Sequence, residues 1–142
     1  MSAQIRRDIL RNWPVLVVDD EADSLEVATR ILRFYGADVT TAVNGQDALR
    51  AVKRFRPRFI ISDLSMPVLD GWGLLYELKM ERDTAEIPVI ALTAHAMNGD
   101  RARAIEAGFH NYLTKPLTTA TFMSELLALL MDIPALAVEL QS

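Results

Sequence analysis

The side chains in this sequence that could do chemistry together are acids, one hydroxyl and one amine, and each follows a short strand-like run. They are Asp19, Asp20 and Glu21 after one run, Asp63 after a second, Thr93 after a third and Lys115 after a fourth. Two like unit charges about 4 Å apart repel by roughly 4 kcal/mol at an effective dielectric near 20. Acids gathered in this way therefore need a cation, or a proton held by a raised pKa.

The all-oxygen character of this set points to Mg²⁺, a hard cation that accepts one or two carboxylates together with phosphate oxygens. With one carboxylate as nucleophile, Lys115 could neutralise charge on phosphoryl oxygens and Thr93 could donate a hydrogen bond to them. These are the parts required to form an aspartyl phosphate. Other phosphate-handling or nucleophile motifs (GxxxxGK[ST], GxGxxG and GxSxG) are absent from the sequence.

Each of these residues also has an ordinary structural interpretation. Asp19, Asp20 and Asp23 could cap the first helix and complement its dipole. Thr93 could bond the backbone at a strand end, and Lys115 could be a solvated surface lysine. The joint placement of the acids, the hydroxyl and the amine at strand ends favours a functional site.

The elements that must position these residues alternate between short apolar runs and longer amphipathic stretches. We expect strands at Val15–Val18, Asp38–Ala42, Arg58–Ser62, Ile87–Leu92 and Asn111–Thr114. Helices are expected between them, one stopping at Gly36, one N-capped by Asn44, one after Asp70-Gly71, one starting at Asn98 or Asp100, and a last one over Thr118–Met131. This pattern predicts an α/β fold, a single doubly wound (βα)5 domain whose parallel sheet binds ligands beyond the carboxyl ends of its strands.

Composition bounds the function further. The 142 residues carry 15 Lys+Arg against 19 Asp+Glu, a formal net charge of −4 that argues against nucleic-acid binding by the bulk surface. The absence of cysteine excludes disulfides, thiol catalysis and cysteine-ligated metals, and two histidines are too few for a His-rich metal site. No apolar run approaches the roughly 20 residues of a membrane span, and residues 1–13 lack the pattern of a secretory signal. We therefore expect a cytoplasmic protein.

The two ends of the chain lie outside the predicted repeat of strands and helices. We expect an N-terminal extension at 1–13, the domain at 14–132 and a C-terminal tail at 133–142. Ile5, Ile9 and Trp13 could form a docking stripe, but a frayed arm fits the sequence equally well. The apolar tail Ala135–Leu140 could start a linker or form a small helix.

Five ordered motifs make the chain closely similar to the receiver domain of two-component response regulators, from about Pro14 to Met131. The motifs are Val17–Glu21, Ile61–Pro67, Asp70-Gly71, Leu92–Ala94 and Tyr112–Pro116. The resemblance implies a flavodoxin-like fold with the strand order 2-1-3-4-5. No motif position is degenerate, so the resemblance implies a receiver that can be phosphorylated.

Position by position, the resemblance implies a role for each acid. It makes Asp63 the phospho-acceptor and Asp20 a direct Mg²⁺ ligand. It makes Asp19 the acidic partner that acts through a metal-bound water, and it makes the main-chain carbonyl of Ser65 a further ligand. Asp63 itself completes the metal site.

The resemblance also implies roles for the remaining motif residues. Thr93 matches the hydroxyl that bonds the phosphoryl group, Lys115 the counter-charge, and Tyr112 the switch aromatic that packs inward when Thr93 moves. The Lys115–Pro116 bond matches a cis peptide. His95, two residues past Thr93, either lines the water's approach to the phosphoryl group or is an exposed loop residue.

The function implied is a single-domain response regulator, a phosphoacceptor switch rather than an enzyme. It would take a phosphoryl group on Asp63 from a histidine kinase or a phosphotransfer protein, and would signal through protein contacts as a monomer or a phosphorylation-dependent dimer. The family's usual output surface maps to about Asn98–Met131, including Arg101, Arg103 and Glu106. We expect no direct nucleic-acid contact and no membrane association.

Three alternatives stay open at this point. The chain could be a receiver excised from a hybrid kinase or a longer regulator. It could be a Mg²⁺-dependent aspartyl-phosphate phosphohydrolase, although such enzymes need a DxD pair after the first strand and a substrate-binding cap. It could also be a protein-binding module for which Asp63 is dispensable.

Overall fold

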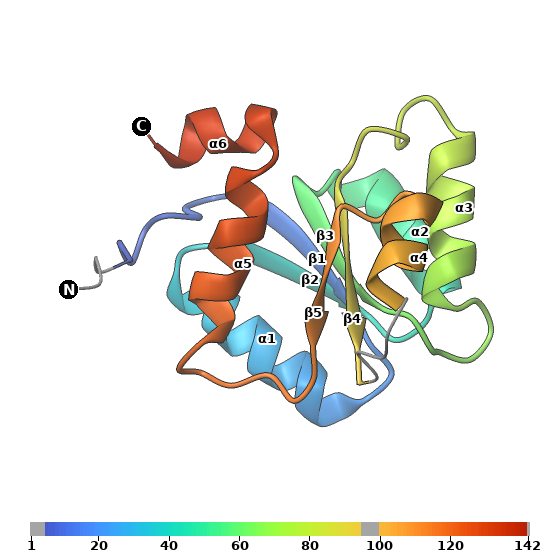
Figure 1. The fold of residues 1–142 in the computed structure, drawn as a ribbon, viewed down its shortest axis with the longest axis horizontal. Coiled ribbons are helices and arrows are strands. Elements are labelled where there is room, and N and C mark those ends of the chain that lie inside the picture. The colour runs from blue at the N-terminus through green and yellow to red at the C-terminus, as the bar shows by residue number, and fades with distance from the viewer. Residues whose placement is uncertain (1–4, 95–99, 142) are drawn as a thin grey trace.

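A computed structural model describes residues 5–94 and 100–141, and its centre is a sheet of five parallel strands. The strands are β1 (Pro14–Val18), β2 (Asp38–Ala42), β3 (Phe59–Asp63), β4 (Val89–Thr93) and β5 (Asn111–Thr114). They pair in the order β2-β1-β3-β4-β5, which confirms the order implied by the resemblance (Figure 1). Every residue of β3 and β4 is buried, as expected for strands covered on both faces.

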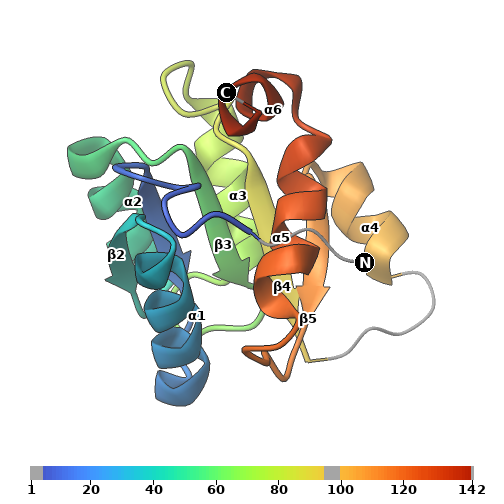
Figure 2. The ribbon, with the colours of Figure 1, turned by 90° about the vertical axis from the view of Figure 1, so that its left-hand side faces the viewer.

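The helices cover the two faces of the sheet in separate layers. They are α1 (Ala22–Phe34), α2 (Gly45–Phe55), α3 (Gly71–Met80), α4 (Asp100–Ala107), α5 (Phe122–Met131) and α6 (Pro134–Leu140). α1 and α5 pack on one face in a core cluster that α6 extends, whereas α2, α3 and α4 pack on the other (Figure 1 and Figure 2). Within the described ranges, no helix is both long and apolar enough to cross a membrane.

Local signals account for several helix ends. Gly36 follows α1 with a φ of 98°, the left-handed conformation expected of a C-terminal glycine. The side chain of Asn44 caps α2 by accepting a hydrogen bond from the Asp47 N–H at 2.8 Å. Asp70 caps α3 in the same way through the Gly73 N–H, also at 2.8 Å.

Two elements begin two or more residues later than their sequence pattern predicts. β4 begins at Val89 rather than Ile87, because the Ile87 N–H bonds the Thr84 carbonyl in a turn and Pro88 has no N–H. α5 begins at Phe122 rather than Thr118. The hydroxyls of Thr118 and Thr121 bond each other at 2.8 Å in the preceding turn, the local side-chain bonding that competes with helix formation.

The residues near both chain ends pack onto the α1/α5 face. Leu10, Trp13, Leu136 and Leu140 are buried in the same core cluster as that face of the sheet. Arg58 joins the two segments, because its guanidinium lies 4.7 Å from the centre of the Trp13 ring and forms an ion pair with Glu139. The tail we expected at 133–142 therefore contains a helix that packs on the core, although the domain boundaries themselves stay a prediction.

Candidate functional site

The predicted site residues meet at the carboxyl edge of the sheet because neighbouring strands end there in register. Val18 pairs with Ser62, Asp63 pairs with Leu92, and Thr93 pairs with Thr114. Main-chain bonds continue past the strand ends: the Asp19 N–H donates to the Ala42 carbonyl, and the Lys115 N–H donates to the Thr93 carbonyl at 2.8 Å. The backbone of the site is thus held by the sheet rather than by free loops.

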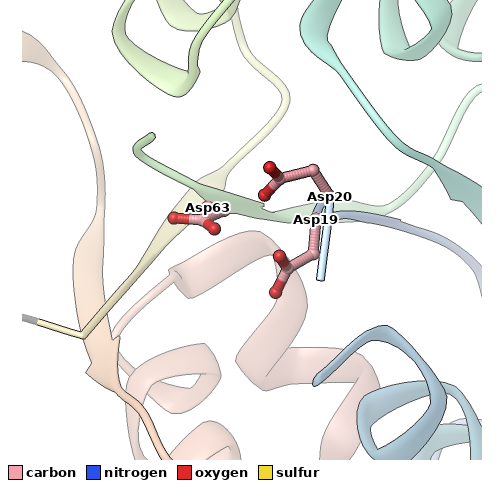
Figure 3. A group of neighbouring side chains, drawn as sticks. All are labelled: Asp19, Asp20 and Asp63. Carbon is pink, nitrogen blue, oxygen red and sulfur yellow. The ribbon is translucent and has the colours of Figure 1, made fainter. Parts of the chain in front are cut away.

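Three acids form a compact cluster at this edge. One carboxylate oxygen from each of Asp19, Asp20 and Asp63 lies within 4.8 Å of the others (Figure 3). Asp19 is fully buried and Asp63 is 6% exposed, whereas Asp20 is exposed. Backbone N–H groups fix the two buried carboxylates, since Glu21 donates to Asp19 Oδ1 at 2.9 Å and Ser65 donates to Asp63 Oδ1 at 3.1 Å.

Lys115 supplies positive charge to this cluster. Its Nζ lies 3.0 Å from Asp63 Oδ2 and donates to Asp19 Oδ1 at 3.2 Å, and its side chain is only 7% exposed. The same Nζ also pairs with the carboxylate of Glu21. Sequence reasoning gave Glu21 no separate role, although its position directly after the two aspartates was the available signal.

Lys115 does not fully offset the effect of burial on the pKa of Asp19. Burial raises the pKa of Asp19 to about 6, and the nearby charge of Asp63 adds to the rise. The hydrogen bonds from the Glu21 N–H and Lys115 act in the opposite direction and lower this pKa. Burial lowers the pKa of Lys115, but its hydrogen bonds to Glu21, Asp19 and Asp63 outweigh this effect, so the pKa is raised overall. Asp19 therefore holds its proton unusually well, and Lys115 stays charged.

The cluster fits a hard divalent cation. All three acids offer oxygen ligands, which is the donor set that Mg²⁺ prefers. The buried Asp19 Oδ2 lies 3.0 Å from Lys115 Nζ yet makes no hydrogen bond to the residues that the structure describes, which leaves it a lone pair for a further positive partner. Ser65 lies beside the cluster through its N–H, whereas its carbonyl as a metal ligand stays a prediction.

The remaining predicted residues border the same edge. Thr93 is the last residue of β4 and is 8% exposed. Tyr112 is half-buried against the α2/α3/α4 core cluster and lines a pocket of about 470 Å³ between β5, α4 and α5. The Lys115–Pro116 peptide is cis, which confirms that expectation. His95 lies outside the described residues.

Comparison with known proteins identifies the family. Residues 15–127 match the response regulator receiver domain. The chain belongs to this family. As a receiver domain of two-component systems, it is of a kind that acts as a phosphoacceptor switch and is not generally classed as an enzyme.

Individual relatives agree with this membership. The chain is 43% identical over 117 residues to the transcriptional regulatory protein PrrA of Mycobacterium tuberculosis, covering 82% of this receiver and 49% of PrrA. This receiver thus spans about half the length of that relative.

Two solved structures share the fold. The chemotaxis response regulator CheY4 of Vibrio cholerae is 28% identical with a TM-score of 0.78, over 84% of this chain and 99% of CheY4. The receiver domain of the sensor histidine kinase PA1611 of Pseudomonas aeruginosa is 34% identical with a TM-score of 0.73, over 82% of this chain and 96% of that one. The PA1611 structure holds a magnesium ion coordinated in its active site cleft.

Proposed function

We propose that this receiver accepts a phosphoryl group on Asp63, from a histidine kinase or a histidine phosphotransfer protein, in a reaction that requires Mg²⁺. The observation that supports this most directly is the contact of Lys115 Nζ with both Asp63 and Asp19 inside a cluster of three carboxylates. A buried lysine beside one carboxylate would be an ordinary ion pair. A lysine shared by crowded acids, one of them with a raised pKa, is arranged to receive further charge.

The acceptor chemistry follows from the contacts of Asp63. Ser65 N–H holds Oδ1 and Lys115 holds Oδ2, so the carboxylate is oriented for attack on phosphorus. Lys115 then neutralises charge on the transferred group, and the Thr93 hydroxyl donates a hydrogen bond to it. When bound, Mg²⁺ would be held by Asp20, Asp63 and the Ser65 carbonyl, with Asp19 completing the acidic set, and would neutralise phosphoryl charge.

The switch proposed for this receiver couples Thr93 to Tyr112. Movement of Thr93 toward the phosphoryl group vacates space beside β5, and the Tyr112 ring packs inward. The pocket that Tyr112 lines, with Arg101 and Glu125 at its border, then changes shape and presents a new surface on α4, β5 and α5. Hydrolysis of the aspartyl phosphate resets the switch, so phosphorylation biases an equilibrium between two arrangements.

The receiver would work as a cytoplasmic single-domain regulator that contacts a downstream protein as a monomer or as a phosphorylation-dependent dimer. The second candidate is a receiver module of a hybrid histidine kinase or a longer regulator. Two observations favour it: the chain matches about half of PrrA, and the similar PA1611 receiver belongs to a histidine kinase.

The test is intact mass spectrometry after incubation with acetyl phosphate, with and without Mg²⁺. We expect one phosphoryl adduct that depends on Mg²⁺, is labile to mild base, and is lost in Asp63→Asn. Asp70→Asn is the matched control, because Asp70 is an exposed aspartate that caps α3 near the same loop, and it should label normally. An adduct that persists in Asp63→Asn would refute the assignment.

A further inference from the structure

A run of basic residues surrounds the end of α2, at the edge of the sheet opposite the acceptor. The stretch between Asp47 and Asp63 contains no acidic residue, although the whole chain has a formal net charge of −4. Its basic residues are Arg50, Lys53, Arg54, Arg56 and Arg58. All of them precede β3, and Asp63 ends that strand of five residues, about 13 Å beyond its start at roughly 3.3 Å per residue.

The bases at the two ends of this run have partners within the domain. Arg50 forms an ion pair with Asp47 at 2.9 Å, and the guanidinium of Arg58 pairs with Glu139. These contacts join α2 to its own first turn and β3 to α6. The fold therefore accounts for both of these arginines.

The three bases in the middle of the run are exposed, and the fold accounts for them less well. Lys53 lies 3.9 Å from Glu81, and an exposed pair of this kind contributes little to stability. Within the described residues, neither Arg54 nor Arg56 forms an ion pair. Lys53 and Arg54 lie in the last turn of α2 and complement its dipole, whereas Arg56 lies after the last helical residue.

The backbone at Arg56 suits glycine better than arginine. Arg56 has a φ of 45° and a ψ of 67°, the left-handed conformation, and its N–H donates to the Val52 carbonyl at 3.0 Å to close α2. Glycine adopts this conformation without the steric cost that a Cβ brings. The arginine side chain thus adds nothing to the turn, and it is exposed to solvent.

A hollow of about 470 Å³ lies beside these bases, between the end of α2 and the turn that precedes β4. Val52, Pro57 and Ile87 give it an apolar lining, and Lys53 and Arg56 line it on the side of α2. The hollow therefore combines apolar surface with positive charge on one side.

We propose that the end of α2 is a docking surface for an acidic segment of a partner protein that also carries apolar side chains. Arg54 and Arg56 present planar guanidinium groups, which bind carboxylates through two parallel hydrogen bonds. An apolar side chain of the segment enters the hollow, and Phe55, which is 47% exposed, packs against the segment. Glu81 and Asp83 line the hollow from the turn after α3 and repel the acids of the segment, which keeps these acids on the side of α2.

The composition of this surface favours a protein over a nucleic acid or a membrane. Its two cations without an ion pair are arginines, and an exposed aromatic ring lies between them in the sequence. Arginine and aromatic residues are enriched in protein interfaces, whereas lysine is depleted. A membrane or a long nucleic acid would also meet the rest of this negatively charged chain, which a short segment does not cover.

The inference goes beyond the proposed function, because the surface and the acceptor lie at opposite edges of the sheet. A partner bound at the end of α2 leaves Asp63 open to its donor. The receiver can then be held by one protein while another phosphorylates it.

Three substitutions test the proposal. Arg56→Gly removes the side chain but leaves the residue best suited to the left-handed backbone, so this variant should unfold at the same or a higher urea concentration. Arg54→Gln removes the second guanidinium. Arg30→Gln is the matched control, because Arg30 is an exposed arginine on α1 that pairs with Glu26.

The measurement is fluorescence anisotropy of a fluorescein-labelled peptide of four Glu-Glu-Leu repeats, titrated with the full chain at low ionic strength. We expect the unchanged chain and Arg30→Gln to bind the peptide with the same Kd, and the double variant Arg54→Gln/Arg56→Gly to bind it about tenfold more weakly. A peptide of Gln-Gln-Leu repeats should not bind, and added salt should weaken the binding of the Glu-Glu-Leu peptide. Backbone NMR shifts on binding should centre on residues 53–58, and acetyl phosphate should label all chains equally.

Several outcomes would overturn the docking surface. Absence of binding by the Glu-Glu-Leu peptide, or equal affinity of the double variant and the unchanged chain, would show that α2 does not end in such a surface. Lower stability of Arg56→Gly would show that the arginine serves the fold. Tighter binding of a single-stranded oligonucleotide or of phosphatidylserine vesicles, lost in the same double variant, would replace the acidic segment by that other anion.

Discussion

Replacing Asp19 by asparagine should stabilise this receiver in the absence of Mg²⁺. The pKa of Asp19 is raised by burial from 3.8 to about 6, so the folded protein binds this proton more tightly than the unfolded chain does. That difference corresponds to about 3 kcal/mol, at about 1.4 kcal/mol per tenfold change in proton affinity. The contribution of Asp19 to the free energy of unfolding is therefore greatest at low pH. This contribution falls as the pH rises from about 4 to 6, and above that range it is lower by the full amount of about 3 kcal/mol.

The asparagine removes the buried charge but keeps the shape of the side chain. Lys115 loses one partner and retains Asp63 and Glu21. We expect a gain of about 2–3 kcal/mol near pH 7.5 and only about 1 kcal/mol near pH 4.5, where the carboxyl is mostly protonated in the folded state. For a domain of this size the larger gain corresponds to a rise in Tm of roughly 10 °C.

The assay is urea unfolding with a chelator at both pH values, followed by a titration with Mg²⁺. Asp20→Asn is the control, since Asp20 is exposed and its substitution should change the apo stability little. Added Mg²⁺ should stabilise the unchanged chain more than Asp19→Asn. A variant less stable than the unchanged chain near pH 7.5, or equally stabilised at both pH values, would refute the reasoning.

Three further predictions concern the site and the packing of α6. Mg²⁺ affinity should fall as the pH drops below about 6, because Asp19 is then protonated and must lose that proton when Mg²⁺ binds. Calorimetric titration at several pH values measures this, and a Mg²⁺ affinity that does not change with pH would contradict it. Leu136→Ala should lower the free energy of unfolding by about 2–4 kcal/mol, while Val138→Ala on the same helix should change it little; equal effects would mean that α6 does not pack on the core. Gly71→Ala should abolish labelling by acetyl phosphate with the circular dichroism spectrum retained, because its Cβ would collide with the Asp63 carbonyl and lie 2.9 Å from Leu64 Cα, and normal labelling would contradict this.

The parts of the structure that are predictable from sequence are those encoded locally or by strand ends. Asn44 and Gly36 mark helix ends through side-chain capping and a left-handed φ, which single residues determine. Asp19, Asp63 and Lys115 could be expected to meet because parallel strands deliver their last residues to one edge. The order of the strands came from the family motifs, since periodicity alone does not determine it.

Other features depend on contacts between distant segments and leave no local pattern. The pairing of Glu21 with Lys115 uses two long side chains that local periodicity would leave in solvent. The φ of 70° at Val68 runs against the backbone preference of a branched residue, so propensity argues for the wrong conformation. α6 is held by Leu136 and Leu140 in the core, and the ion pair of Glu139 with Arg58 joins it to the residue before β3.

The packing of both chain ends on one face of the sheet has a consequence for synthesis on the ribosome. The buried members of the α2/α3/α4 cluster end at Phe109, so this half of the core is complete in sequence while the rest of the chain is still being made. The opposite cluster contains both Leu10 and Leu140, so it is complete only after α6 has left the exit tunnel. Nascent chains stalled after Phe109 emerges should thus protect the first cluster from proteolysis and leave Leu10 and Trp13 cleavable, and equal protection of both would contradict this order. Leu10 and Trp13 would then be among the last buried residues of this domain to find their partners, although they precede its whole sheet in the sequence.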